Sequence, residues 1–249
     1  MSAPLTNRVT PDAAGAGARP FIAAPWHTLS ILLIYGYVGF RIGMPHLAPA
    51  SGSGPPTPAA ASHAAMIRAY LLSILSEWGM VYWAWAGVHW KGGQMRDLTG
   101  GRWTSWRGVA LDVAIAIPFW FIWELTAWLM SRAVERVPAA AATYHPPSGF
   151  AEVALWILLS ISAGICEEIV FRGYLQRQFR AATRSIVAAV ILQGAVFGMA
   201  HTYQGWKRVI VIAVLGILYG TLVAWRRNLR ASMIAHAWSD IFEGWLRSL

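Results

Sequence analysis

Two adjacent carboxylates and an arginine, Glu167, Glu168 and Arg172, follow a long apolar run at residues 153–165, which is typical of a membrane helix. An ionised carboxylate costs on the order of 3 kcal/mol to insert into a bilayer, so two together indicate a functional site. Glu168 and Arg172 are four residues apart and can pair on one helical face. Adjacent helical residues diverge by about 100°, so Glu167 and Glu168 are not expected to share a partner.

Three polar residues in the later apolar segments are candidate partners for Glu167. His201 ends one segment, and His236 and Asp240 share a face of another because they are four residues apart. At 1.5 Å per residue, Glu167 and His201 lie roughly 20 and 25 Å from the turn between their helices. His236 and Asp240 lie roughly 9–15 Å deep from the same side, which is a looser match. We therefore expect these four residues to converge in a cavity within the membrane.

This set of side chains is sufficient for peptide hydrolysis. A carboxylate beside an imidazole can hold a water molecule and take its proton. A histidine N–H can stabilise the oxyanion that then develops on the peptide carbonyl. No serine or cysteine nucleophile is required. The single cysteine, Cys166, adjoins the Glu pair and is expected to be a buried thiol without a catalytic role.

The composition defines the class of protein. Of 249 residues, 57% are hydrophobic and 12% are charged, whereas soluble domains carry about 25% charged residues. The fifteen tryptophans fit a membrane protein, because indoles collect at membrane–water interfaces. The net charge of +9 resides mostly between apolar runs, which favours contact with anionic lipid over nucleic-acid binding.

The apolar segments predict an all-α, polytopic transmembrane bundle of about seven spans, with a catalytic core in the last four. The expected spans are residues 27–44, 64–90, 108–130, 150–180, 185–201, 209–225 and 231–246. They divide the chain into a flexible N-terminal arm (1–26), three N-terminal transmembrane helices with their loops (27–149) and a four-helix catalytic core (150–249). Lysine and arginine are more frequent on the side of the N-terminus, which predicts that this end is cytoplasmic. The Ala- and Arg-rich, Lys-poor composition suggests a bacterium and therefore its inner membrane.

Other features of the spans support close packing. Gly194 and Gly198, and Gly216 and Gly220, form two GxxxG patterns that allow neighbouring helices to approach. Phe197 is expected to be a packing residue. Three further acids lie in the spans and are expected to bond between helices or to line the cavity: Glu77, Asp112 and Glu124.

Taken in order, the motifs resemble the CPBP family of intramembrane proteases, which includes CAAX prenyl endopeptidases and bacteriocin-processing, Abi-type proteins. The resemblance covers roughly residues 150–245. It is carried by three motifs: Glu167-Glu168-x-x-x-Arg172, Phe197-x-x-x-His201 and His236-x-x-x-Asp240.

The resemblance implies a role for each residue. Glu167 and His201 would activate a water molecule, while Glu168 and Arg172 would give structural support. His236 and Asp240 would form the oxyanion side of the site. Asp240 stands where the CAAX enzymes have asparagine, and an ionised Asp cannot donate a hydrogen bond. Asp240 is therefore expected either to be protonated or to orient His236.

Several alternatives stay open. We expect no cofactor, but Glu167, His201 and His236 would be the ligands if the site held Zn²⁺. No HExxH motif is present. The substrate would be a membrane-associated protein or peptide, prenylated or not. A different class of function is a non-catalytic proton or ion relay, or an immunity or scaffold protein, that uses the same polar cavity.

Overall fold

The computed structural model describes residues 20–47, 63–101, 103–134 and 147–244, and the described residues form helices without strands. The predicted all-α class is confirmed. The helices are α1 (Pro25–Leu47), α2 (His63–His89), α3 (Met95–Thr99), α4 (Trp106–Val134), α5 (Gly149–Glu167), η1 (Glu168–Leu175), α6 (Gln176–Thr183), α7 (Ile186–Ala200), η2 (Thr202–Gln204), α8 (Trp206–Arg226) and α9 (Arg230–Gly244).

Each of the seven predicted spans corresponds to one helix or continuous helical segment. Four of these, among the described residues, are long and apolar enough to cross a membrane: α2, α4, the continuous segment α5–η1–α6 (Gly149–Thr183) and α8. The other three are α1, α7 and α9. Helices α7 and α9 have 15 residues each, or about 22 Å, which is less than the ~30 Å of a hydrocarbon core.

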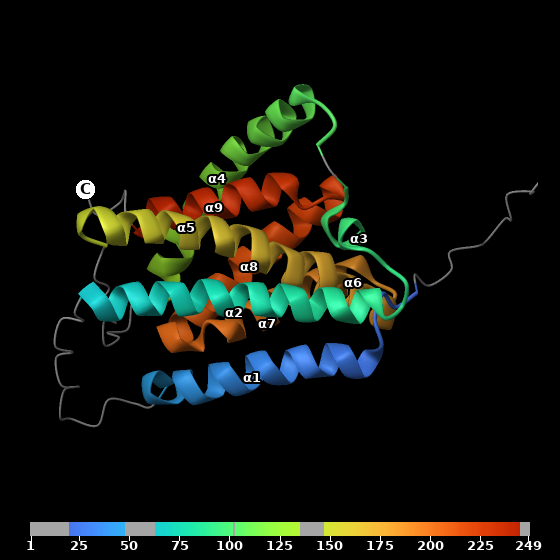
Figure 1. The fold of residues 1–249 in the computed structure, drawn as a ribbon, viewed down its shortest axis with the longest axis horizontal. Helices are drawn as coiled ribbons and strands as arrows, with labels where there is room; N and C mark the ends of the chain where they lie inside the picture. Colours follow the sequence, from blue (N-terminus) through green and yellow to red (C-terminus); the bar gives the residue numbers. More distant parts are fainter. Residues whose placement is uncertain (1–19, 48–62, 102, 135–146, 245–249) are drawn as a thin grey trace, which may run out of the picture.

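The segment α5–η1–α6 lies in the middle of the bundle (Figure 1). Helices α2 and α9 both pack against α5, and α7 and α8 form the most extensively packed pair. Helix α4 contacts α8 and α9, and one end of it stands away from the other helices at the top of Figure 1. The buried Asp112 attaches α4 to the bundle, because its carboxylate lies 3.0 Å from Arg226 Nη2 and 2.9 Å from Arg230 Nε.

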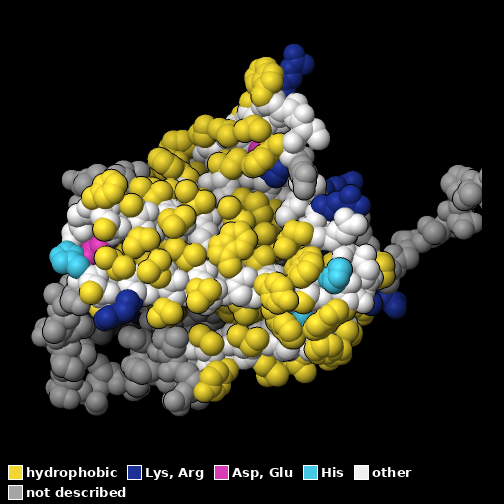
Figure 2. All heavy atoms as spheres, viewed as in Figure 1, with side chains coloured by type: hydrophobic (Ala, Val, Ile, Leu, Met, Phe, Trp, Pro, Cys, Tyr) yellow, Lys and Arg dark blue, Asp and Glu magenta, His cyan; other side chains and the backbone are white. Residues whose placement is uncertain are grey.

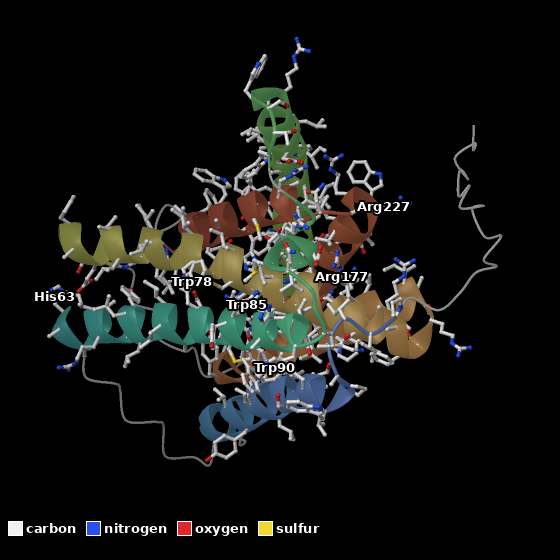
Figure 3. The ribbon with its side chains drawn as sticks, turned by 45° about the vertical axis from the view of Figure 1, so that its right-hand side comes forward. His63, Trp78, Trp85, Trp90, Arg177 and Arg227 are labelled. Atoms are coloured by element: carbon white, nitrogen blue, oxygen red, sulfur yellow. The ribbon has the colours of Figure 1, made fainter. Side chains whose placement is uncertain are left out.

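The surface agrees with a membrane protein. Figure 2 shows hydrophobic side chains across the whole visible face, with basic side chains near its edges. Large exposed apolar residues occur on α1, α2, α4 and α7, including Leu33, Leu72, Phe121 and Val187. In Figure 3, Arg177 and Arg227 lie towards one end of the bundle and His63 lies at the other.

The close approach expected from the GxxxG patterns is present between α7 and α8. A Cβ atom built on Gly194 would lie 2.9 Å from Ala213 O and 3.0 Å from Ile217 N. One built on Gly216 would lie 3.0 Å from Gly194 Cα. The two backbones therefore meet at these glycines, about two helical turns before His201.

Two local features differ from the expectation. The connection predicted at residues 91–107 contains a short helix, α3. The expected flexible arm at residues 1–26 lies mostly outside the described residues, but its last part is held in place. The buried amide of Gln178 accepts hydrogen bonds from Ile22 N and Ala23 N at 2.9 and 3.3 Å and donates to Ala23 O at 3.0 Å.

Candidate active site

The helix that carries the Glu pair is not uniformly α-helical. It was expected to be one long α-helix over residues 150–180, but Glu168–Leu175 is a π-helix, and all eight of its residues are buried. π-Helical turns widen a helix and occur frequently at functional sites. The wide turn begins directly after Glu167, so it changes the direction in which the following side chains leave the helix.

The ion pair predicted between Glu168 and Arg172 is present. Arg172 Nη1 lies 2.9 Å from Glu168 Oε1, and both side chains are fully buried. Arg172 Nη2 also donates to Gly216 O on α8 at 3.2 Å. Its guanidinium lies 4.4 Å from the centre of the Phe197 ring, a favourable cation–π distance. Arg172 therefore connects η1 with α7 and α8.

His236 contacts both members of the Glu pair, which corrects the expectation that they would not share a partner. His236 Nδ1 donates to Glu168 Oε1 at 3.0 Å, and Nε2 lies 3.6 Å from Glu167 Oε2. The two nitrogens lie on different edges of the imidazole, so one ring can meet two diverging carboxylates. Asp240 Oδ2 lies 3.8 Å from the same Nε2. The depth mismatch estimated for His236 and Asp240 is thus absent.

Two aromatic rings hold His236 in this position. Tyr219 stacks on it at 4.9 Å between ring centres and 21° between ring planes, and its hydroxyl lies 3.2 Å from Ser239 Oγ. Phe197 meets His236 edge-on at 5.9 Å and also contacts His201 at 4.9 Å. Tyr219 was not predicted as a site residue, although its position as an aromatic residue inside the Gly216–Gly220 motif was a signal. Phe197 is a packing residue, as expected, and it touches both histidines.

His201 follows the last residue of α7 and is partly buried. Its Nδ1 lies 2.8 Å from Phe197 O. A carbonyl oxygen only accepts hydrogen bonds, so Nδ1 carries the hydrogen. In the neutral ring, Nε2 is then left as an acceptor. The ring is thus fixed by the backbone of its own helix while one nitrogen stays available for chemistry.

Glu167 and His201 both line a cavity of about 170 Å³. Its lining also includes residues of α1 and α2, which lie outside the predicted four-helix core. His236 and Asp240 are not among the lining residues, although His236 touches Glu167. The cavity is lined by Tyr35, Ser73, Ser76, Glu77, Met80, Cys166, Glu167, Val170, Phe171, Ala200, His201 and Tyr203.

The three other acids of the spans lie in different environments. Glu77 lines the cavity, where its Oε2 accepts a hydrogen bond from Ser162 Oγ at 2.7 Å. Asp112 is the buried acceptor of the α4 ion pairs, and Glu124 is not a cavity residue. Ser73 and Ser76 also line the cavity and were not predicted as site residues. Their spacing beside Glu77 places several polar residues on one part of an otherwise apolar span, which was a usable signal.

The zinc alternative concerns Glu167, His201 and His236. Within the described ranges, no group of three or more His, Cys, Asp or Glu residues is placed to hold a metal ion. The alternative ligand set of Glu167, His201 and His236 does not form such a group.

A scan against protein families gives one match over this part of the chain. Residues 149–242 match the family described as type II CAAX prenyl endopeptidase Rce1-like. No curated protein and no solved structure matches the chain. The match covers α5 to α8 and most of α9, and it includes all three motifs. The resemblance to CPBP proteases is thus confirmed, and residues 149–242 form an Rce1-like segment of the CPBP type.

Proposed function

We propose that this protein is an intramembrane endopeptidase that hydrolyses a peptide bond of a membrane-associated protein or peptide with a water molecule activated by Glu167. One observation carries the proposal. Glu167 lines a small cavity together with His201, and its carboxylate also lies 3.6 Å from His236 Nε2. A general base, a second acceptor and a donor for an oxyanion are thus gathered within an Rce1-like segment.

The first step is activation of water. Glu167 takes one proton from a water molecule in the cavity, and His201 Nε2 accepts a hydrogen bond from the O–H that remains on this water. The hydrogen bond from His201 Nδ1 to Phe197 O supports this role, because it leaves Nε2 as the acceptor. The water oxygen then attacks the carbonyl carbon of the substrate.

The second step is stabilisation of the oxyanion. In its charged form, His236 presents Nε2–H on the side of Glu167, where it can donate to the negative oxygen. Glu168 holds the opposite nitrogen at 3.0 Å and Arg172 holds Glu168, so the ring is fixed before the reaction. Asp240, at 3.8 Å from Nε2, orients His236 and donates nothing itself.

The orientation and the location belong to the same proposal. The end of the bundle that carries Arg177 and Arg227 would face the cytoplasm, together with the N-terminus, in a bacterial inner membrane (Figure 3). In an Arg227→Cys variant that also carries Cys166→Ser, the thiol at position 227 should react only with a reagent that enters the cytoplasm.

The decisive experiment compares the protein termini of membranes that carry the wild type or Glu167→Gln, with and without a chelator. We expect termini that are present with the wild type, absent with Glu167→Gln and unaffected by the chelator. The masses of the new C-terminal peptides will also show whether the cleaved proteins are prenylated. The variant must elute and unfold like the wild type in detergent, which excludes a folding defect.

The other outcomes separate the alternatives. If the chelator abolishes wild-type cleavage, the water is activated by a bound metal ion and not by the Glu167 carboxylate alone. Identical termini for the wild type and Glu167→Gln would reject the protease. A relay or scaffold protein would then be the better description.

A further inference from the structure

Glu77 lies outside the Rce1-like segment but faces the same cavity as Glu167. It belongs to α2 and directly precedes Trp78, which marks this part of the helix in Figure 3. Its Oε2 accepts a hydrogen bond from Ser162 Oγ at 2.7 Å. Among the described residues, its Oε1 accepts no hydrogen bond and no cation lies at ion-pair distance from it.

An ionised carboxylate in this position would be unfavourable. A charge in an apolar membrane helix is expensive unless a cation or several donors compensate it, and the half-buried Glu77 has one hydroxyl donor. Glu168, the first residue of η1, contrasts with it because Arg172 and His236 both compensate its charge. Glu77 therefore differs from Glu168 in its chemistry as well as in its position.

The proposed hydrolysis leaves one requirement unassigned. The departing nitrogen of a peptide bond must receive a proton, because an amide anion is too basic to leave. Glu167 is occupied with the proton of the attacking water. A second carboxyl group that carries a proton and faces the same space would supply what the leaving amine needs.

We propose that Glu77 is a second catalytic carboxyl of this site and protonates the leaving amine; this rests on the proposed peptidase function. The hydrogen bond from Ser162 engages Oε2, so the acidic hydrogen resides on Oε1, the oxygen free to reach the substrate. Helix α2 therefore completes the active site that the Rce1-like segment begins.

Each proton that moves in the proposed reaction is accounted for. Glu167 gains a proton from water as the C–O bond forms. Glu77 gives its proton to the nitrogen as the C–N bond breaks. A water molecule in the cavity then carries the proton from Glu167 to Glu77, and the site returns to its initial state. Both groups line a cavity large enough for several waters, which permits this transfer.

A structural role for Glu77 makes a different prediction, and the chain offers a matched control for it. The hydrogen bond to Ser162 joins α2 to α5, and Glu152 joins the same two helices through its contact with His63. Glu152 lies about 15 Å along α5 from Ser162 and does not line the cavity. If Glu77 acts only by holding α2 against α5, then Glu77→Gln and Glu152→Gln should have similar effects.

The experiment uses the full-length protein in liposomes with an internally quenched peptide whose sequence spans the most abundant wild-type-dependent cleavage site. Two forms of this peptide are compared, one with the natural amide and one with a thioester at the cleaved bond. A thiolate leaves without a proton, so the thioester does not need Glu77. We expect Glu77→Gln to lower kcat for the amide by about 10²–10⁴-fold and to affect the thioester far less.

The variants separate the possible failures. Glu167→Gln should cleave neither the amide nor the thioester peptide, and Glu152→Gln should cleave both at nearly the wild-type rate. An equal loss of amide and thioester cleavage by Glu77→Gln, or wild-type amide cleavage by it, would overturn the role of Glu77 while leaving the peptidase intact. An absence of any wild-type-dependent cleavage would reject the peptidase and this inference together.

Discussion

Glu168 Oε1 lies 3.0 Å from His236 Nδ1 and 2.9 Å from Arg172 Nη1, so one buried oxygen meets a histidine of α9 and an arginine of η1. The arginine neutralises the carboxylate, and the carboxylate in turn fixes the histidine. The pair formed within one helix therefore also determines where a residue 68 positions later is held. The Glu168–Arg172 ion pair therefore both supports the site and positions the His236 imidazole.

The first prediction concerns this arrangement. Glu168→Gln and Arg172→Met should each lower the free energy of unfolding by about 3–5 kcal/mol, because each leaves a buried charge uncompensated. The double variant should lose much less than the sum of the two. Chemical unfolding of the purified protein in detergent measures all three. Additive losses would show that the two side chains do not depend on each other.

The second prediction concerns Phe197. Phe197→Leu should keep the core filled but remove the edge contacts to His201 and His236, each worth about 0.5–1.5 kcal/mol. We expect kcat for the cleaved peptide to fall about tenfold, and the free energy of unfolding to fall by about 1–3 kcal/mol because both ring contacts are lost. Phe179→Leu is the control, since Phe179 packs on the same core and, among the described residues, has no ring contact with His201 or His236. If Phe197→Leu and Phe179→Leu lowered kcat equally, Phe197 would act only by packing in the core.

The third prediction tests the contact between α7 and α8. Gly194→Ala places a Cβ atom 2.9 Å from Ala213 O, so it should cost about 1–3 kcal/mol of stability. Gly79→Ala on α2 meets nothing within 4 Å and should be neutral or stabilising by up to about 1 kcal/mol. Thermal unfolding of both variants gives the comparison. If Gly194→Ala were as stable as Gly79→Ala, the backbones would not be in contact at this point.

The fourth prediction concerns the attachment of α4. Asp112→Asn removes the charge that Arg226 and Arg230 share, and Trp103 Nε1 also donates to the same carboxylate at 2.8 Å. Both arginines are about one-fifth exposed, so solvent reduces the loss to about 1–3 kcal/mol. Protease digestion in detergent should become faster in α4. Peptide cleavage at low temperature should stay near the wild-type rate, because Asp112 does not line the cavity. Unchanged digestion would show that other contacts hold α4.

The sequence by itself determined the class of the protein and its local pairings. Composition and apolar segments are enough to predict a helical membrane bundle, because a bilayer accepts little else. The pair Glu168–Arg172 followed from a spacing of four residues, which the geometry of one helix decides without reference to any other. The glycines of α7 and α8 likewise predicted a close approach, because their small size is a local property.

Only the tertiary structure decided which residues of different helices meet. The rotation and axial position of each helix depend on many side chains packing at once, so no single segment encodes them. For this reason the contact of His236 with both Glu167 and Glu168 was not expected, nor was the stacking of Tyr219 on its ring. Glu77 was expected to bond between helices or to line the cavity, and only the packing of α2 against α5 decides that it does both. Spacing along a helix fixes neighbours within about one turn, whereas the site is completed by residues that only the packing of the bundle brings together.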